Sequence, residues 1–220
     1  MKNCNFLVRR PWQIPAHVFV LSALLLHVSL ASKSDAQNSV ILLGQIAIPV
    51  DVTDVWGYVD STSGKEYAIV GTFGSVNIVD VTNPVTPVLV STVSSVPGFD
   101  VKVWRHYVYS VTGGGGINQG GIVDISDPGN PQVVGSFNSS HNIFISGNGF
   151  MFAEAPGLKI YDLNQDPTSP MLLWEDGTGG GHDASVIGNR LFDFHGGSGT
   201  NIYDVSFSNP FSVQLLGSIN

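Results

Sequence analysis

The sequence of 220 residues has few charged side chains, and the basic ones are the scarcest. It holds 9 Lys and Arg against 17 Asp and Glu, which gives a net charge of −8. Binding to nucleic acid needs a basic surface that neutralises phosphates, so this composition excludes nucleic acid as a partner. The same shortage of basic residues argues against electrostatic attachment to an anionic membrane surface.

Cysteine and long apolar runs are also lacking. The single cysteine, Cys4, cannot form a disulfide within the chain, and without it no thiol nucleophile or zinc–thiolate site remains. The main apolar run covers residues 18–30, and its 13 residues would span about 20 Å as a helix. That length is too short for a hydrocarbon core of about 30 Å, so we predict no transmembrane segment in the mature chain.

The N-terminal segment is instead typical of a secretory signal peptide. It has a basic start, an apolar run and small residues that fit a cleavage site: Lys2, Arg9 and Arg10, then residues 18–30, then Ala31 and Ala36. We predict a signal peptide at residues 1–36 and a secreted or cell-surface mature chain at residues 37–220, with a retained signal anchor as the alternative. The mature chain has five Lys and Arg against sixteen Asp and Glu, a net charge of −11.

Repetition is the main feature of the mature chain, which is also rich in turn-forming residues, with 26 Gly and 12 Pro in the full sequence. One phrase recurs four times, as NIVDVTNP, GIVDISDP, KIYDLNQDP and NIYDVSFSNP at residues 77–84, 121–128, 159–167 and 201–210. Three further apolar phrases accompany it, so each repeat has four short runs bounded by Gly, Pro, Asn or Asp. Four strands at a period of 40–45 residues predict a β-propeller blade.

We therefore predict an all-β protein with about four blades of four antiparallel strands, named a to d in chain order. The expected blades cover about residues 41–93, 94–137, 138–175 and 176–219. A surplus phrase of the d type, residues 41–46, precedes the first a strand. In a propeller such a strand completes the last blade, so we expect the four blades to be part of a larger propeller. A closed four-bladed ring with one extra strand is the alternative.

The repeated phrases NIVDVTNP and GIVDISDP resemble those of LVIVD-repeat propellers. Residues 56–71, together with the His-Asx phrases at His141 and His182, are similar to the choice-of-anchor B branch of that group. The likeness covers residues 41–220. It implies a propeller fold and a secreted or surface-attached protein, but no particular reaction. Members of that branch are usually longer and carry varied C-terminal anchoring tails, and no such tail is present here.

Polar residues recur at the start of the a strands: Asp54, Asp100, Asn142 and Asp183, with His141 and His182 preceding the last two. If the a strands are innermost, these equivalent positions converge around one axis. Carboxylates suit Ca²⁺ and imidazoles suit Zn²⁺, so a divalent metal is a possible cofactor. The predicted metal ligands are Asp54, Asp100, His141, His182 and Asp183. The alternative is structural, because Asx side chains commonly hydrogen-bond to backbone groups at turns and strand starts.

A second group of candidates lies in the fourth repeat. Asp193 and His195 are two residues apart on a b strand and therefore share a face, where the other repeats carry an apolar column. Glu154 also departs from the repeat, on the opposite face of its strand. The predicted binding residues are His141, Asn142, His182, Asp183, Asp193 and His195, and no catalytic residue is assigned.

Three functions remain open from the sequence. The first is a binding or adhesion module for an extracellular protein or glycan. The second is a metal-dependent extracellular enzyme that uses the His and Asp ring. The third is a structural fragment without independent function. The lack of a compelling catalytic set favours the binding module over the enzyme.

Overall fold

The computed structural model describes residues 2–7, 40–114, 119–177 and 180–220. These residues form strands and one short 3-10 turn, Gly196–Ser198. No helix among them is long and apolar enough to cross a membrane. The predicted signal-peptide run at residues 18–30 and the cleavage sites at Ala31 and Ala36 lie outside the described residues.

Sixteen of the strands form four sheets, each with four antiparallel strands in sequential order. The first blade contains β3 (Val52–Val59), β4 (Glu66–Thr72), β5 (Ser75–Asp80) and β6 (Val88–Val93). The second contains β7 (Asp100–Trp104), β8 (Tyr107–Val111), β9 (Gln119–Asp124) and β10 (Gln132–Asn138). The third contains β11 (Asn142–Ile145), β12 (Phe150–Glu154), β13 (Leu158–Asp162) and β14 (Met171–Glu175). The fourth contains β15 (Asp183–Ile187), β16 (Arg190–Phe194), β17 (Thr200–Ser206) and β18 (Ser212–Ile219).

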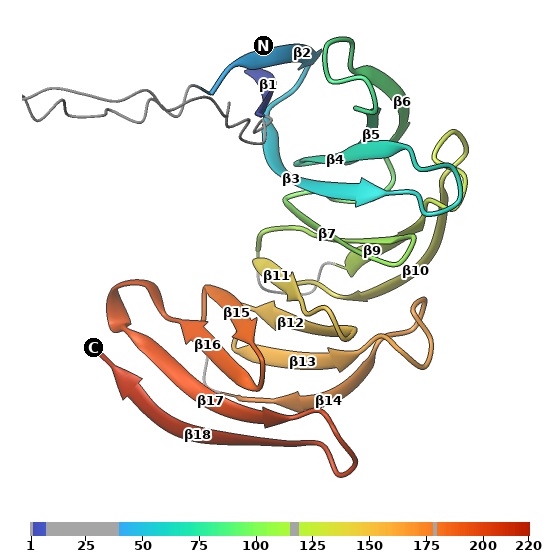
Figure 1. Ribbon diagram of the computed structural model, residues 1–220. Coiled ribbons are helices and arrows are strands. Elements are labelled where there is room, and N and C mark those ends of the chain that lie inside the picture. The colour runs from blue at the N-terminus through green and yellow to red at the C-terminus, as the bar shows by residue number, and fades with distance from the viewer. Residues whose placement is uncertain (1, 8–39, 115–118, 178–179) are drawn as a thin grey trace, which may run out of the picture.

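The blades follow one another along an open arc, with the first and the fourth at its two ends (Figure 1). The a strands β3, β7, β11 and β15 are neighbours in that order, so they line the inner side of the arc. The fold is that of a β-propeller, and the predicted four-stranded antiparallel blades are confirmed. The four described blades do not close into a ring of their own.

The contact between blades is apolar because the middle strands carry apolar residues on both faces. In β4 every residue from Tyr67 to Thr72 is buried. Three cores fill the spaces between consecutive blades, and their fully buried members include Ile69, Ile78 and Ile125; Tyr109, Ile143 and Met151; Phe152, Ile160 and Leu191. Burying one such side chain contributes about 1.5–3 kcal/mol, so stacking of blades is the main source of stability.

Strand β2 (Leu42–Ile48) lies outside the four blades. Its contact with the first blade resembles the contact that the d strand of one blade makes with the following blade. A Cβ on Gly44 would overlap the Pro84 carbonyl oxygen in the turn between β5 and β6. A Cβ on Gly135 of β10 would likewise overlap the Thr168 carbonyl oxygen in the corresponding turn of the third blade. Strand β2 therefore occupies the place of the outermost strand of a blade that precedes the first.

The sheet partner of β2 is β1 (Lys2–Leu7), which pairs with it antiparallel, Cys4 opposite Ile46. Strand β1 lies inside the segment predicted to be the signal peptide, and cleavage of that segment stays a prediction. Removal of β1 would free one edge of β2 for pairing with another strand.

The close approach of Gly135 to the next blade gives a direct test of blade stacking. We expect Gly135→Ala to lower the free energy of unfolding by about 1–3 kcal/mol, because the new methyl group would displace backbone of the neighbouring blade. The matched control is Gly217→Ala at the same repeat position of the fourth blade, where a Cβ would meet no atom within 4 Å. Urea unfolding of both variants measures the difference, and equal losses would contradict the stacking geometry.

Candidate functional site

Antiparallel strands bring two kinds of connection to the same end of every blade. These are the turns between b and c strands and the connections that lead from one blade to the next a strand. We call this end of the arc the site end. His141 and His182 lie there directly before β11 and β15, and His195 lies there directly after β16.

Four rings form a continuous row at the site end, with contributions from connections of all four blades. We call Phe73, Phe99, His141 and His182 the ring row. The ring centroids are 5.8 Å apart for Phe73 and Phe99, 5.1 Å for Phe99 and His141, and 4.5 Å for His141 and His182. The two ends of the row are open to solvent, since Phe73 is 66% exposed and the His182 side chain 58%.

Hydrogen bonds fix the two imidazoles of the ring row. Nδ1 of His141 donates to the Gly113 carbonyl oxygen over 2.6 Å, which fixes the orientation of the ring. Nδ1 of His182 lies 2.7 Å from Oδ2 of the neighbouring Asp183. Both rings are therefore oriented before any ligand arrives.

Two buried carboxyl groups lie behind the ring row, between the third and fourth blades. Glu154 at the end of β12 is fully buried, and Asp193 on β16 is 1% exposed. Oδ2 of Asp193 lies 2.7 Å from Nε2 of His195. Both carboxyl oxygens of Glu154 and Oδ1 of Asp193 have no hydrogen-bond partner in the described part of the chain.

Glycines in the connection before β15 allow this arrangement. A Cβ on Gly181 would overlap Oε2 of Glu154 and lie 3.0 Å from Oδ1 of Asp193. A Cβ on Gly180 would lie 2.9 Å from Nδ1 of His195. The backbone thus covers the carboxyl groups at a distance that only glycine permits.

Burial and the negative charge of Asp193 together raise the pKa of Glu154 to about 9. Removing a carboxylate from water disfavours its charged form, and a second carboxylate nearby adds repulsion. Glu154 is therefore neutral at pH 7 and carries a proton next to the Asp193–His195 pair.

Asp54 and Asp100, which were predicted as metal ligands, accept backbone hydrogen bonds from the next blade. Oδ2 of Asp54 accepts the Val101 N–H over 3.0 Å, and Oδ2 of Asp100 accepts the Ile143 N–H over 2.7 Å. Each bond joins one a strand to the a strand of the next blade. The Lys102 ammonium lies between the two carboxylates and contacts both.

The structure does not bring the predicted metal ligands together as one set. In the described residues no three His, Cys, Asp or Glu side chains are grouped to hold a metal ion. The cation held by Asp54 and Asp100 is Lys102, at a distance of 3.0 Å from Asp54. Burial and the neighbouring Asp54 raise the pKa of Asp100 to about 7. In the described residues Asp54 and Asp100 therefore bind Lys102 and backbone N–H groups, and a Ca²⁺ or Zn²⁺ site formed by Asp54, Asp100, His141, His182 and Asp183 stays a prediction.

The predicted binding residues do gather at the interface of the third and fourth blades. His182 contacts both the His141 ring and the Asp183 carboxylate. The backbone N–H of His182 also donates to the carbonyl oxygen of Phe194, which lies between Asp193 and His195. Asn142 pairs across the sheet with Glu154.

The residues that sequence reasoning did not assign to the site are Phe73, Phe99 and Glu154. The sequence did contain a signal for Glu154, a charged residue where the other repeats carry an uncharged one. Glu154 and Asp193 lie on opposite faces of equivalent strands, and the two residues meet because the front of one blade packs against the back of the next.

The buried proton of Glu154 predicts a pH dependence of stability. Its pKa rises from 4.5 to about 9 on folding, so its contribution is present below pH 4.5 and is lost as the pH rises toward 9. One group can change the free energy of unfolding by at most about 1.4 kcal/mol per pH unit. Glutamine has the shape of a protonated glutamate but does not titrate. We therefore expect the free energy of unfolding of Glu154→Gln to fall by about 2 kcal/mol less between pH 7 and pH 9 than that of the native protein.

Urea unfolding at pH 7 and pH 9 measures this effect, with the exposed Glu175→Gln as the control. The control is expected to follow the native protein. Equal pH dependence of Glu154→Gln and the native protein would show that Glu154 is ionised in the fold.

Comparison with known proteins agrees with the repeat architecture. Residues 61–95 and 99–139 match the family model described as the LVIVD repeat. The search of the curated proteins found no significant match.

Solved structures share the fold at low sequence identity. A protein of unknown function from Desulfotomaculum acetoxidans is 18% identical with a TM-score of 0.59, covering 81% of this chain and 59% of that chain. A periplasmic gluconolactonase from Pseudomonas aeruginosa is 10% identical with a TM-score of 0.63, covering 84% and 61%. A protein from Lactobacillus plantarum is 12% identical with a TM-score of 0.63, covering 83% and 62%.

The chain therefore spans about three-fifths of the length of these structures. At such identities the likeness shows the fold alone. The chain carries LVIVD repeats, and its four described sheets are blades of a β-propeller.

Proposed function

We propose that the protein is a secreted or cell-surface binding module that recognises a neutral carbohydrate chain through the ring row. The observation that carries this proposal is the continuous contact of Phe73, Phe99, His141 and His182 across four blades. Exposed apolar and aromatic patches on soluble proteins mark binding surfaces. Only an extended ligand can touch all four rings at once.

The chemistry of the row favours a sugar chain over an apolar ligand. Ring faces suit the C–H faces of sugar rings, whereas His182 and Asp183 at one end offer hydrogen bonds to hydroxyl groups. At the other end, Phe73 borders a hollow of about 330 Å³. The surface of this hollow is mostly apolar, because the hydroxyls of Thr72, Ser75 and Thr92 are hydrogen-bonded to neighbouring side chains. The row thus has polar groups at the His182 end and an apolar hollow at the Phe73 end.

Charge selects against acidic ligands. The mature chain has a net charge of −11, and its five basic residues include Lys102, which Asp54 and Asp100 already hold. An anionic glycan or polypeptide would be repelled over a range of about 10 Å at moderate ionic strength. A neutral ligand avoids this cost.

Membership of the choice-of-anchor B branch is part of the same proposal. Its support is the sequence likeness at residues 56–71 and at the two His-Asx phrases. Secretion is supported by the composition of residues 1–36.

Calorimetric titration of the purified full chain with neutral hexasaccharides of glucose, mannose and N-acetylglucosamine tests the proposal. We expect one of them to bind, and we expect Phe99→Ala and His182→Ala to weaken that binding about tenfold through loss of ring contacts, or about 1.4 kcal/mol each. The matched control is His106→Ala, since His106 lies in the turn before β8 at the opposite end of the second blade, where its ring contacts Tyr107. Binding unchanged in Phe99→Ala, or no binding of any hexasaccharide, would contradict the proposal.

Hydrolysis of a sugar lactone is a second candidate function. It is favoured by the two His–carboxylate pairs, His182–Asp183 and His195–Asp193, next to a protonated Glu154. One structure of similar fold is named as a gluconolactonase, which suggests glucono-δ-lactone as the test substrate.

Turnover of that lactone by the full chain separates the two candidates. Under the carbohydrate-binding proposal we expect no acceleration over the buffer rate. Acceleration that is lost in both His182→Ala and His195→Ala and retained in His106→Ala would support the lactonase instead.

A further inference from the structure

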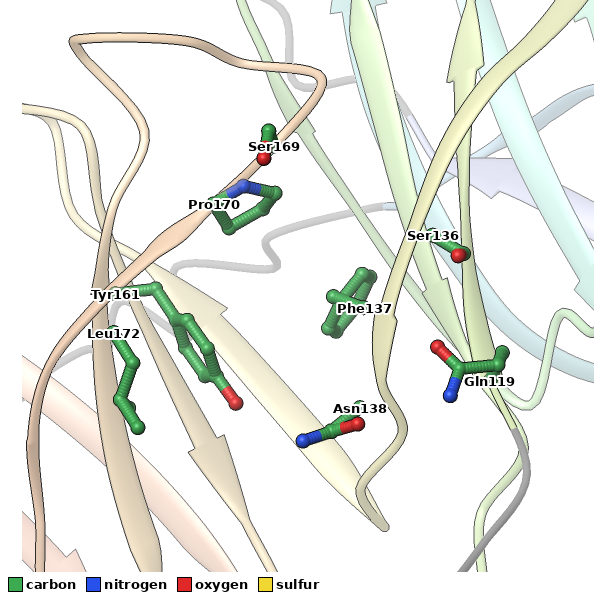
Figure 2. A pocket seen from close by; sticks show the side chains of 8 residues that line it. All are labelled: Gln119, Ser136, Phe137, Asn138, Tyr161, Ser169, Pro170 and Leu172. Carbon is green, nitrogen blue, oxygen red and sulfur yellow. The ribbon is translucent and has the colours of Figure 1, made fainter.

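A separate pocket lies between the second and third blades, lined by residues of their outer c and d strands (Figure 2). Its volume is about 320 Å³, within the range of small-molecule sites. Strands β9 and β10 form one wall, and β13, β14 and the turn between them form the other. The lining residues are Gln119, Ser136, Phe137, Asn138, Tyr161, Ser169, Pro170 and Leu172.

Tyr161 is the unusual residue of this pocket. In the repeated phrases NIVD, GIVD, KIYD and NIYD its position is held by Val79 in the first blade, Val123 in the second and Tyr203 in the fourth. The Tyr161 side chain is 5% exposed, and its hydroxyl group has no hydrogen-bond partner in the described chain. Figure 2 shows this hydroxyl directed toward the Asn138 side of the pocket.

A buried hydroxyl without a partner is costly, by about 1–3 kcal/mol. The hydroxyl of Tyr203, the counterpart in the fourth blade, does have hydrogen-bond partners, the side chains of Asn201 and Asp176. Burial raises the pKa of Tyr161, so the hydroxyl keeps its proton and can act as a hydrogen-bond donor. The replacement of valine by tyrosine thus adds a hydrogen-bonding group that the fold itself does not use.

The remaining lining residues define the chemistry of a fitting ligand. The pocket has no Asp, Glu, Lys, Arg or His in its lining. Amide and hydroxyl groups of Gln119, Asn138, Ser136 and Ser169 both donate and accept hydrogen bonds, as sugar hydroxyls do. The Phe137 ring and Leu172 offer apolar surface.

We propose that this pocket binds one uncharged pyranose ring, with the Tyr161 hydroxyl and the Asn138 amide as its hydrogen-bonding partners. An ionised ligand would find no counter-charge there and would lose its hydration without compensation. The pocket is formed by c and d strands, whereas the ring row is formed by connections at the site end, so the two sites are distinct.

Saturation-transfer NMR and titration with methyl glycosides of glucose, mannose and galactose test the pocket on the full chain. We expect at least one glycoside to bind with millimolar affinity. Tyr161→Phe removes only the hydroxyl, and we expect it to weaken binding three- to tenfold. The matched control is Tyr203→Phe at the same repeat position, which is expected to leave binding unchanged.

One further variant separates the pocket from the ring row. Asn138→Ala is expected to weaken glycoside binding in the same way and to leave hexasaccharide binding at the ring row unchanged. Unfolding measurements confirm that each variant folds, and the unpaired hydroxyl predicts no loss of stability in Tyr161→Phe. The proposal is overturned if no glycoside binds at concentrations of up to about 50 mM, well above the millimolar affinity expected, or if Tyr161→Phe and Tyr203→Phe behave alike.

Discussion

The contact between the facing surfaces of consecutive blades is the interaction on which the rest of the structure depends. A single blade has middle strands with apolar residues on both faces, as in the buried run from Tyr67 to Thr72. Only the next blade can remove such a face from water, at a gain of roughly 25 cal/mol per Å². At the inner edge, Asp54 and Asp100 add hydrogen bonds across the same contact. Close backbone approach, as at Gly135, then sets the spacing of the outer strands.

The same stacking creates the chemical groups that a single blade does not have. Glu154 and Asp193 belong to different blades, and they meet because the front of the third blade covers the back of the fourth. The ring row forms in a similar way, since its rings come from four separate connections. The outer pocket also lies between two blades, with Tyr161 on one side and Asn138 on the other. Each candidate for binding is therefore a property of an interface between repeats.

The sequence was sufficient to predict what lies within one repeat. The period of about 42 residues predicted the four strands of each blade, and the surplus phrase at residues 41–46 predicted a strand outside them, which is β2. It was not sufficient for contacts between repeats. Comparison of the four repeats placed Asp54 and Asp100 at equivalent positions and led to the prediction of a metal site. It could not show that the Lys102 ammonium lies between the two carboxylates. Phe99 holds the repeat position of His141 and His182, directly before an a strand, but the sequence did not show that these three rings touch. Phe73 lies in a turn between b and c strands, at a position that is not equivalent to theirs.

The most direct measurement of the binding surface is NMR spectroscopy of the full chain with carbon-13-labelled Phe and His, during titration with the neutral hexasaccharides. The account predicts that one hexasaccharide shifts the ring signals of Phe73, Phe99, His141 and His182 together, while the signals of His106 stay in place. Shifts confined to rings outside the row, or unchanged signals of all four rings at millimolar ligand, would contradict it.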